Sequence, residues 1–253
     1  MTIRLRPRMT SILALCLAPI AAGCTSTTEG LDLTENGILT LILHRVSGSA
    51  VATAAATVKD AGLLGALGQS LVLADDQIIS VNNVPLSAST LTSLGIESAY
   101  SATIEAVDEP DTYTIEFDDA GVVTSVELTP PEDFEDVTPE TGDEVTYDGF
   151  TLQWEAPDDE DDATIDITLS GYALSYNSAG SVDTVEYAVA FNDLADDGSV
   201  SIGETDLQYF TPGALTLTLT RTKAVSQKTG FAAGSLTMTI TKTLTLDLTD
   251  AEE

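Results

Sequence analysis

The sequence is poor in the residues from which most catalytic and metal sites are built. Its 253 residues include two cysteines and one histidine. A Ser-His-Asp or Cys-His site would have to use His44, and a zinc site with several histidine or cysteine ligands is excluded by number. His44 stands beside Arg45 in a strand-like run without any catalytic motif. It is therefore interpreted as a strand-edge histidine and not as a general base.

Positive charge is also scarce. Nine lysines and arginines stand against 41 acidic residues, which gives a formal net charge of -32. Such a surface disfavours nucleic acid and anionic phosphates as partners. It fits a saline habitat or sites that collect divalent cations, and composition does not separate these two alternatives. Hydrophobic residues make up 43% of the chain, enough for packed cores, so global disorder is not indicated.

The start of the chain has the pattern of a cleaved leader. Three arginines lie within residues 1–8, ahead of a short apolar run over residues 12–22 that Pro19 interrupts. A membrane-spanning helix needs roughly 20 apolar residues, so a permanent span is not expected. The order of positive, apolar and small residues predicts a signal peptide over residues 1–23. Loss of its three arginines changes the formal charge from -32 to -35.

The end of this leader, Ile-Ala-Ala-Gly-Cys at residues 20–24, resembles the lipobox of bacterial lipoproteins. The resemblance implies cleavage before Cys24, a diacylglyceryl thioether on its sulfur and an acylated amino terminus. Thr25 stands where inner-membrane retention places aspartate, which implies the outer membrane, facing either periplasm or cell surface. Residues 24–30 are expected to be a lipidated tether of at most about 20 Å. An ordinary secretory leader with a chance cysteine is the alternative.

Alternation of apolar and polar residues with period two dominates the remaining sequence, and helical periodicity is scarce. The pattern predicts strands at 39–46, 50–58, 77–81, 99–106, 113–118, 122–128, 150–155, 164–169, 184–191, 199–202, 214–221 and 235–248. Residues 118–121, Asp-Asp-Ala-Gly, predict a hairpin turn. The apolar parity of the last strand is broken only by Lys242, near which a bend or a crossing between sheets is expected. Short helices within 60–68 and 87–95 remain open.

An acidic, proline-containing segment over residues 130–143 is interpreted as a linker. It divides the chain into residues 31–129 and 144–253, so we expect an all-β protein with two tandem antiparallel β-sandwich domains. This organisation resembles uncharacterised bacterial outer-membrane lipoproteins with immunoglobulin-like domains. The segments that carry the resemblance are 75–82, 113–117, 125–131, 149–154, 196–202 and 215–221. The Cys…Trp…Cys signature of antibody domains is absent, so Trp154 is expected only to fill a core.

Two acidic segments are candidate calcium sites. The first is the loop after Pro157, with Asp158, Asp159, Asp161 and Asp162, and its alternative is a solvated connection between strands. In the second, Asp193, Asp197 and Glu204 fall on positions 1, 5 and 12 of an EF-hand loop. Ala195 fails at position 3 and a strand precedes the loop, which favours a turn over residues 196–198.

The absence of a catalytic motif predicts a non-enzymatic function. We expect a lipid-anchored envelope protein that is a structural or interaction module for adhesion or binding, with calcium as an optional ligand. The alternative is an accessory subunit that binds a saccharide or peptide for an envelope transport or assembly system. A hydrolase that uses carboxylates alone is a third interpretation, although no pair among the 41 acids is marked out.

Overall fold

The computed structural model of the protein describes residues 33–61, 70–88, 99–108, 111–157, 163–176, 182–226 and 230–250. Nearly all of this is β-structure, which confirms the all-β class. The strands are β1 (Gly37–Val46), β2 (Val51–Asp60), β3 (Gln77–Val81), β4 (Val84–Pro85), β5 (Ser87–Ala88), β6 (Ala99–Glu105), β7 (Tyr113–Asp119), β8 (Val122–Leu128), β9 (Glu144–Thr146), β10 (Gly149–Gln153), β11 (Ala163–Tyr176), β12 (Val182–Ala195), β13 (Ser199–Gly203), β14 (Gly213–Ser226) and β15 (Ala233–Thr249). The helices of these residues are α1 (Leu33–Asn36) and α2 (Glu204–Leu207), and neither is long or apolar enough to cross a bilayer.

Every strand that the alternation predicts is present, with bounds that shift by a few residues. The largest differences are at β11 and β12, which extend well beyond the predicted 164–169 and 184–191. The hairpin between β7 and β8 is confirmed: Ala120 and Gly121 both have positive φ, and the Gly121 amide donates to Asp118 Oδ1 at 2.7 Å. The possible helices at 60–68 and 87–95 fall largely outside the described residues.

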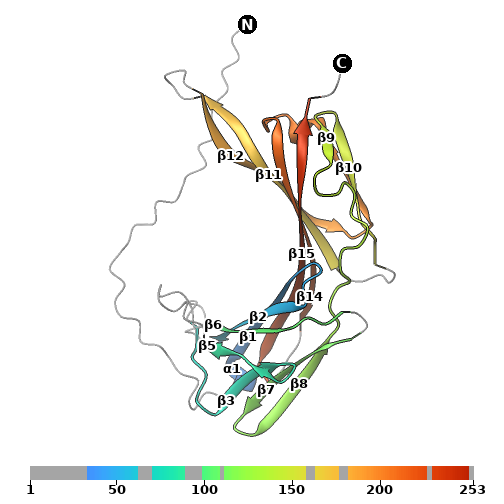
Figure 1. Cartoon of the computed structure of the whole chain (residues 1–253). Helices are drawn as coiled ribbons and strands as arrows, with labels where there is room; N and C mark the ends of the chain where they lie inside the picture. The colour runs from blue at the N-terminus through green and yellow to red at the C-terminus, as the bar shows by residue number, and fades with distance from the viewer. Residues whose placement is uncertain are drawn as a thin grey trace.

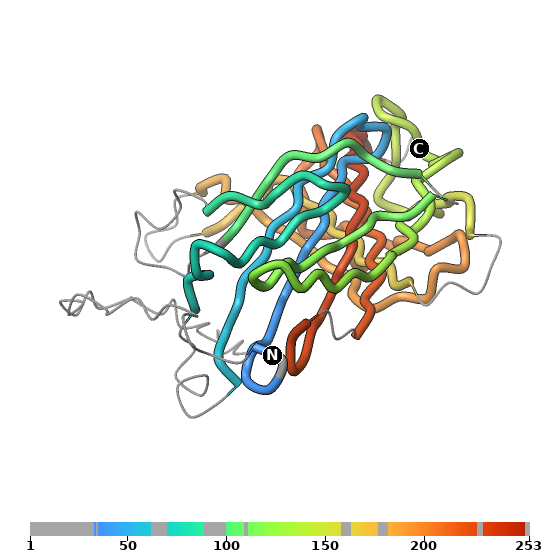
Figure 2. The backbone as a smooth tube through the Cα atoms, turned by 90° about the horizontal axis from the view of Figure 1, so that it is seen from below, coloured from blue at the N-terminus to red at the C-terminus, as the bar shows by residue number. Residues whose placement is uncertain are grey.

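One long sheet joins the two halves of the chain (Figure 1). Its nine strands follow the order β12-β11-β14-β15-β1-β2-β6-β5, with β9 paired to β15. β1 from the first half and β15 from the second are parallel neighbours from Ile38 to Val46, and Figure 2 shows the blue strand β1 beside the red strand β15. β9 is also parallel to β15. The sheet is therefore mixed, whereas the sequence pattern predicted antiparallel pairing throughout.

Two hydrophobic cores lie along this sheet. In the first, β1, β2 and the start of β15 pack against the four-stranded sheet β4-β3-β7-β8. In the second, β11, β14 and the end of β15 pack against the pair β10-β13 and α2. The predicted core residue Trp154 is buried in the second core. β15 contributes to both cores from the same side: Leu236 and Met238 to the first, and Leu244 and Leu246 to the second.

The segment between the two cores, residues 130–143, is packed and not a free tether. Phe134 and Val137 are buried members of the second core. The segment follows β15 between the end of the β1 pairing at Thr241 and the start of the β9 pairing at Asp247, and the Gly142 amide donates to the Thr245 carbonyl at 2.8 Å. The division into two separate domains stays a prediction. Because β15 contributes side chains to both cores, the two halves of the chain share a strand.

We expect the two cores to unfold as one unit, because β14 and β15 run through both. Leu41 is fully buried in the first core, and Leu41→Ala should cost about 2–5 kcal/mol of unfolding free energy. The fluorescence of Trp154, the only tryptophan, reports on the second core. Leu41→Ala should lower the urea midpoint of that fluorescence transition. An unchanged midpoint would mean that the halves unfold independently.

Candidate functional site

A row of inward-facing cations marks the border between the two cores. Arg45 on β1 and Arg221 on β14 both lie opposite Ile240 of β15, one on each side. Each arginine follows buried leucines on the inward parity of its strand, after Leu43 in β1 and after Leu219 in β14. Lys242 occupies the next inward position of β15. The crossing between sheets expected near Lys242 is absent, because β15 pairs with β14 without interruption from Ser235 to Leu248.

Arg221 is the most deeply buried of these cations, with 1% of its surface exposed. Its Nη1 donates to the carbonyls of Glu132 and Asp133 at 2.7 and 3.1 Å. Its Nη2 donates to the Glu155 carbonyl at 3.0 Å and to Asp196 Oδ1 at 3.2 Å. The guanidinium also lies 4.7 Å from the centre of the Phe134 ring. Arg221 thereby binds the segment 132–134 to the second core.

Asp196 compensates the buried charge of Arg221. Its Oδ2 lies 2.6 Å from Arg221 Nε, in a close ion pair that departs from hydrogen-bond geometry. Its Oδ1 accepts a hydrogen bond of 2.6 Å from the indole of Trp154. Only 3% of the Asp196 side chain is exposed. Buried ions are tolerated when they are paired and hydrogen-bonded, so these contacts depend on each other.

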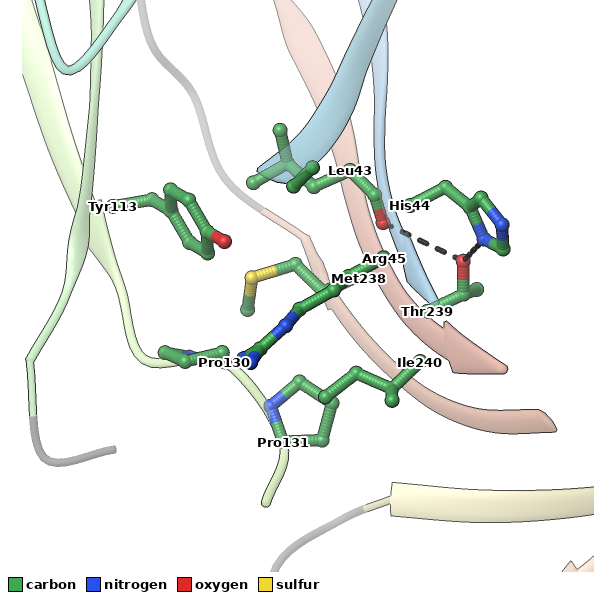
Figure 3. Close-up of a pocket in the computed structure, with 10 residues that line it drawn as sticks. Leu43, His44, Arg45, Tyr113, Pro130, Pro131, Met238, Thr239 and Ile240 are labelled. Atoms are coloured by element: carbon green, nitrogen blue, oxygen red, sulfur yellow. Dashed lines mark hydrogen bonds between the residues drawn. The ribbon is translucent and has the colours of Figure 1, made fainter. Parts of the chain in front are cut away.

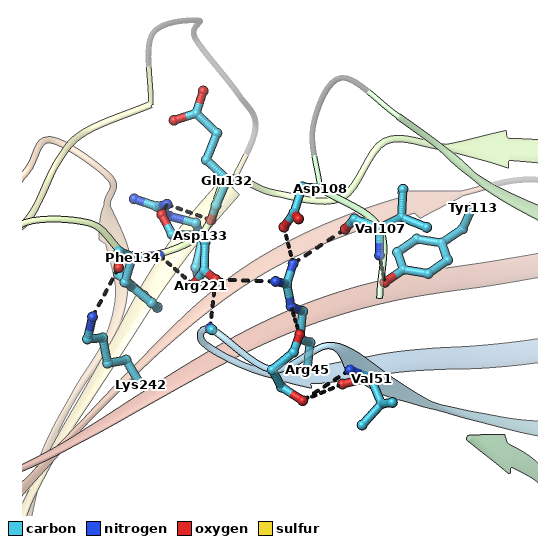
Figure 4. A network of polar contacts seen from close by, with 12 residues as sticks. Arg45, Val51, Val107, Asp108, Tyr113, Glu132, Asp133, Phe134, Arg221 and Lys242 are labelled. Atoms are coloured by element: carbon cyan, nitrogen blue, oxygen red, sulfur yellow. Dashed lines mark hydrogen bonds and ion pairs between the residues drawn. The ribbon is translucent and has the colours of Figure 1, made fainter. Parts of the chain in front are cut away.

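Arg45 holds the same segment from the side of the first core (Figure 4). Its guanidinium pairs with Asp108, donates to the Ser49 carbonyl at 2.9 Å and lies 3.6 Å from Asp133 Oδ2. That Asp133 oxygen also accepts the Gly48 amide at 2.8 Å. Burial raises the pKa of Asp133, but the Ser47 hydroxyl, the Gly48 and Phe134 amides and the charge of Arg45 together outweigh it. The pKa of Asp133 therefore lies below its ordinary value of 3.8.

Lys242 completes the arrangement, because its Nζ donates to the Phe134 carbonyl at 3.1 Å. Three of the six basic residues outside the predicted leader thus contact residues 132–134. We call Arg45, Arg221, Lys242, Asp133 and Asp196 the junction cluster. Sequence reasoning missed it, although a signal was present. Arg45 and Arg221 are the only arginines after the predicted leader, and both stand on the apolar parity of a strand.

The pocket beside Arg45 is too small for a ligand (Figure 3). Its lining includes Tyr113, Pro130, Pro131 and Met238, and its cavity holds about 10 Å³. Ligand pockets typically enclose about 300–1,000 Å³. Two shallow depressions flank Lys242, with volumes of about 450 and 410 Å³, and carboxylates of the segment 133–140 line both of them.

His44 lies on the outer face of the sheet and not at a strand edge. β1 runs between β15 and β2, so the strand-edge interpretation is wrong. The Nδ1 of His44 is 3.0 Å from the Thr239 hydroxyl, and that hydroxyl donates to the Leu43 carbonyl at 3.5 Å (Figure 3). Which of the two groups donates in the contact between His44 and Thr239 depends on the tautomer of the imidazole.

The candidate calcium ligands are not gathered where the structure describes them. Asp193 occupies a bulge at the end of β12, where its φ is 54° and its amide donates to Asp166 Oδ1 at 2.8 Å. Asp197 lies in the predicted turn between β12 and β13, and Glu204 begins α2. Within the described residues, no group of three or more His, Cys, Asp or Glu side chains is placed to hold a metal ion. Asp158, Asp159, Asp161, Asp162 and Cys24 lie outside the described residues, so their assignments stay predictions.

Compared with models of known protein families and with curated protein sequences, the chain matches none.

We expect Asp196→Asn to destabilise the protein strongly, because it leaves the Arg221 guanidinium buried without a counter-charge. Breaking a buried ion pair from one side typically costs about 3–5 kcal/mol. Asp108→Asn is the matched control. It removes a carboxylate from Arg45 at a side chain that is 71% exposed, where a loss of about 1 kcal/mol or less is expected. Urea unfolding compares the two variants, and equal losses would contradict the dependence of the junction on Arg221.

Asp133→Asn should change how stability depends on acid. The pKa of Asp133 is lowered in the folded protein, so its charged form stabilises the fold above pH 3.8, and this contribution is lost as the pH falls through the lowered pKa. The variant should be about 1–2 kcal/mol less stable than wild type at neutral pH. Unfolding free energies measured from pH 7 to pH 3 should show this difference shrinking on the acid side. A difference that stays constant with pH would contradict the assignment.

Proposed function

We propose that this chain is a non-enzymatic lipoprotein of the bacterial outer membrane, anchored through Cys24, and that it is a structural or interaction module of the envelope. The observation that carries the proposal is the leader: a positive start, a short apolar run and small residues directly before a cysteine. Several acyl chains hold a protein firmly, because each buried CH₂ contributes about 0.8 kcal/mol.

The first described residue supports a close approach to the lipid. Leu33 is buried in the first core, so only residues 24–32 separate that core from Cys24. Nine residues extend to about 30 Å at most, at 3.3–3.6 Å per residue. In this proposal the first core is beside the membrane. The shared strands β14 and β15 then hold the second core at a defined position beyond it.

An interaction role is supported by exposed apolar side chains on β11 and β12. Tyr172, Leu174 and Tyr176 alternate along one side of β11, and Val182 on β12 lies opposite Tyr176. All four are at least half exposed. Isolated apolar residues on a surface need no explanation, but a contiguous apolar group on a very acidic protein is typical of an interaction site.

The same residues favour the second candidate function, a saccharide- or peptide-binding accessory subunit. Tyr172 and Tyr176 are exposed on one face of a single strand. Exposed aromatic rings offer an apolar face with a polar tip, which suits both classes of ligand. A transporter that co-purifies from native membranes would favour this second role over a stand-alone module.

Cys24→Ser tests the anchor. Wild-type protein expressed with its leader in a Gram-negative host should fractionate with membranes, and the intact mass of the mature chain should exceed its polypeptide mass by the attached acyl groups. The variant has no sulfur to acylate and should appear in the soluble fraction. Cys16→Ser, within the predicted leader, is the matched control and should remain in membranes. Membrane-bound Cys24→Ser protein would overturn the proposal.

A further inference from the structure

β12 is a long strand at the margin of the large sheet. It comprises 14 residues and stands at one end of the strand order, with β11 as its neighbour. Figure 1 shows it on the outer side of β11, and no further strand of the described chain pairs with it. A strand at an edge presents a row of unpaired backbone N–H and C=O groups, which can pair with a strand from another chain.

The inward side of β12 leaves the second core unfinished. Ile167 and Leu169 on β11 are fully buried, whereas their partners Phe191 and Val189 on β12 are only partly buried. Tyr187 is also only partly buried, and its ring packs edge-on against that of Phe210, with 5.1 Å between the ring centres. A further strand beyond β12 would cover these three side chains with alternate residues of its own. Apolar area removed from water contributes about 25 cal/mol per Å².

The usual protection of an edge strand is weak here. Natural proteins guard edges with lysine, proline, inward charges or bulges. β12 contains no lysine and no proline, and its one inward acid, Asp183, and its bulge lie near opposite ends of the strand. From Val182 to Phe191 its register with β11 is regular. Val185 points inward, opposite the buried Ala173, and is 41% exposed. Ten residues of regular backbone are therefore open to pairing.

Charge decides between possible occupants. β12 carries Asp183, Glu186 and Asp193 without any basic residue. A second copy would bring the same acidic strand, from a chain with a formal charge of -32, against its own like charges. An occupant with lysine or arginine would meet these acids favourably, and the acidic field would speed its approach. The edge therefore favours a basic strand over a copy of itself.

We infer that β12 is a docking edge for an extended, basic segment of a partner protein, which adds to the sheet as a further strand. Its alternate apolar residues cover Tyr187, Val189 and Phe191 on the inward side, and its lysines or arginines lie on the outer side, where Glu186 is exposed. Backbone pairing supplies affinity, and the alternate side chains supply selectivity. The inference rests on the proposed interaction role and names the class of partner.

The first test uses a synthetic nine-residue peptide of alternating lysine and valine with the full-length protein in detergent at physiological salt. Its control has the same sequence with N-methyl groups on the five central amides, which keeps the charge but prevents strand pairing. The parent peptide should bind at least tenfold more tightly, and the amides of β12 should gain protection from hydrogen exchange. Equal binding of the two peptides would reduce the effect to charge attraction and overturn the inference.

Two variants on neighbouring residues locate the binding. Val185→Lys places an inward charge at the edge, the natural block to strand addition, and should weaken binding of the parent peptide at least tenfold. Thr184→Lys makes the same charge change on the outer side of β12 and should weaken it far less. Equal weakening by both variants would overturn the inference. Both variants should keep the wild-type melting temperature, because both residues are exposed.

The remaining outcomes separate this inference from the proposed function. A wild-type dimer in sedimentation that Val185→Lys dissociates would show that a second copy occupies the edge, and the basic partner would be wrong. If the parent peptide does not bind, while wild type is attached to membranes and Cys24→Ser is released from them, the docking edge alone is overturned. Membrane-bound Cys24→Ser with strand addition intact would overturn the anchor alone.

Discussion

The ion pair between Arg221 and Asp196 is the interaction on which the junction of the two cores depends. Taking a guanidinium and a carboxylate out of water is costly, so each is stable there only in the presence of the other and of the surrounding carbonyls. Those carbonyls belong to Glu132, Asp133 and Glu155. The buried Arg221 guanidinium thus determines the path of the segment between the cores, because it requires these carbonyls as hydrogen-bond acceptors. Conversely, an apolar residue at position 221 would leave that segment without its hydrogen-bond donors.

The strands β14 and β15 connect the two cores directly. A flexible tether would let two sandwiches move independently, but here one continuous hairpin supplies side chains to both cores. Arg45 and Lys242 bind the segment 132–134 from the side of the first core and from β15. For a protein proposed to be anchored at one end, this shared hairpin would set how far the edge strand β12 projects from the membrane. Three of the six basic residues outside the predicted leader lie at this border.

Local sequence patterns were sufficient to predict most of the secondary structure. The alternation in β7 and β8 and the turn between them were readable because a strand with one buried face has period two and a two-residue turn needs positive φ. The strands β4, β5 and β9 are two or three residues long and have no readable period. The junction cluster was missed because Arg45, Asp133, Asp196 and Arg221 are far apart in the chain. The EF-hand spacing of Asp193, Asp197 and Glu204 was misleading for the opposite reason, since spacing alone says nothing about the strand and bulge that hold Asp193.

Composition and local pattern were enough to establish the all-β class, the inward and outward faces of the strands, and the presence of one cysteine and one histidine outside the predicted leader. These properties are local or compositional, so they need no knowledge of which strands are neighbours. The folded chain was needed to show that β1 pairs with β15, that Lys242 falls between two cores and that β12 is left at an edge. Strand pairing depends on backbone hydrogen bonds that are nearly the same for every residue, and therefore the choice of partner is made by the packing of the whole chain.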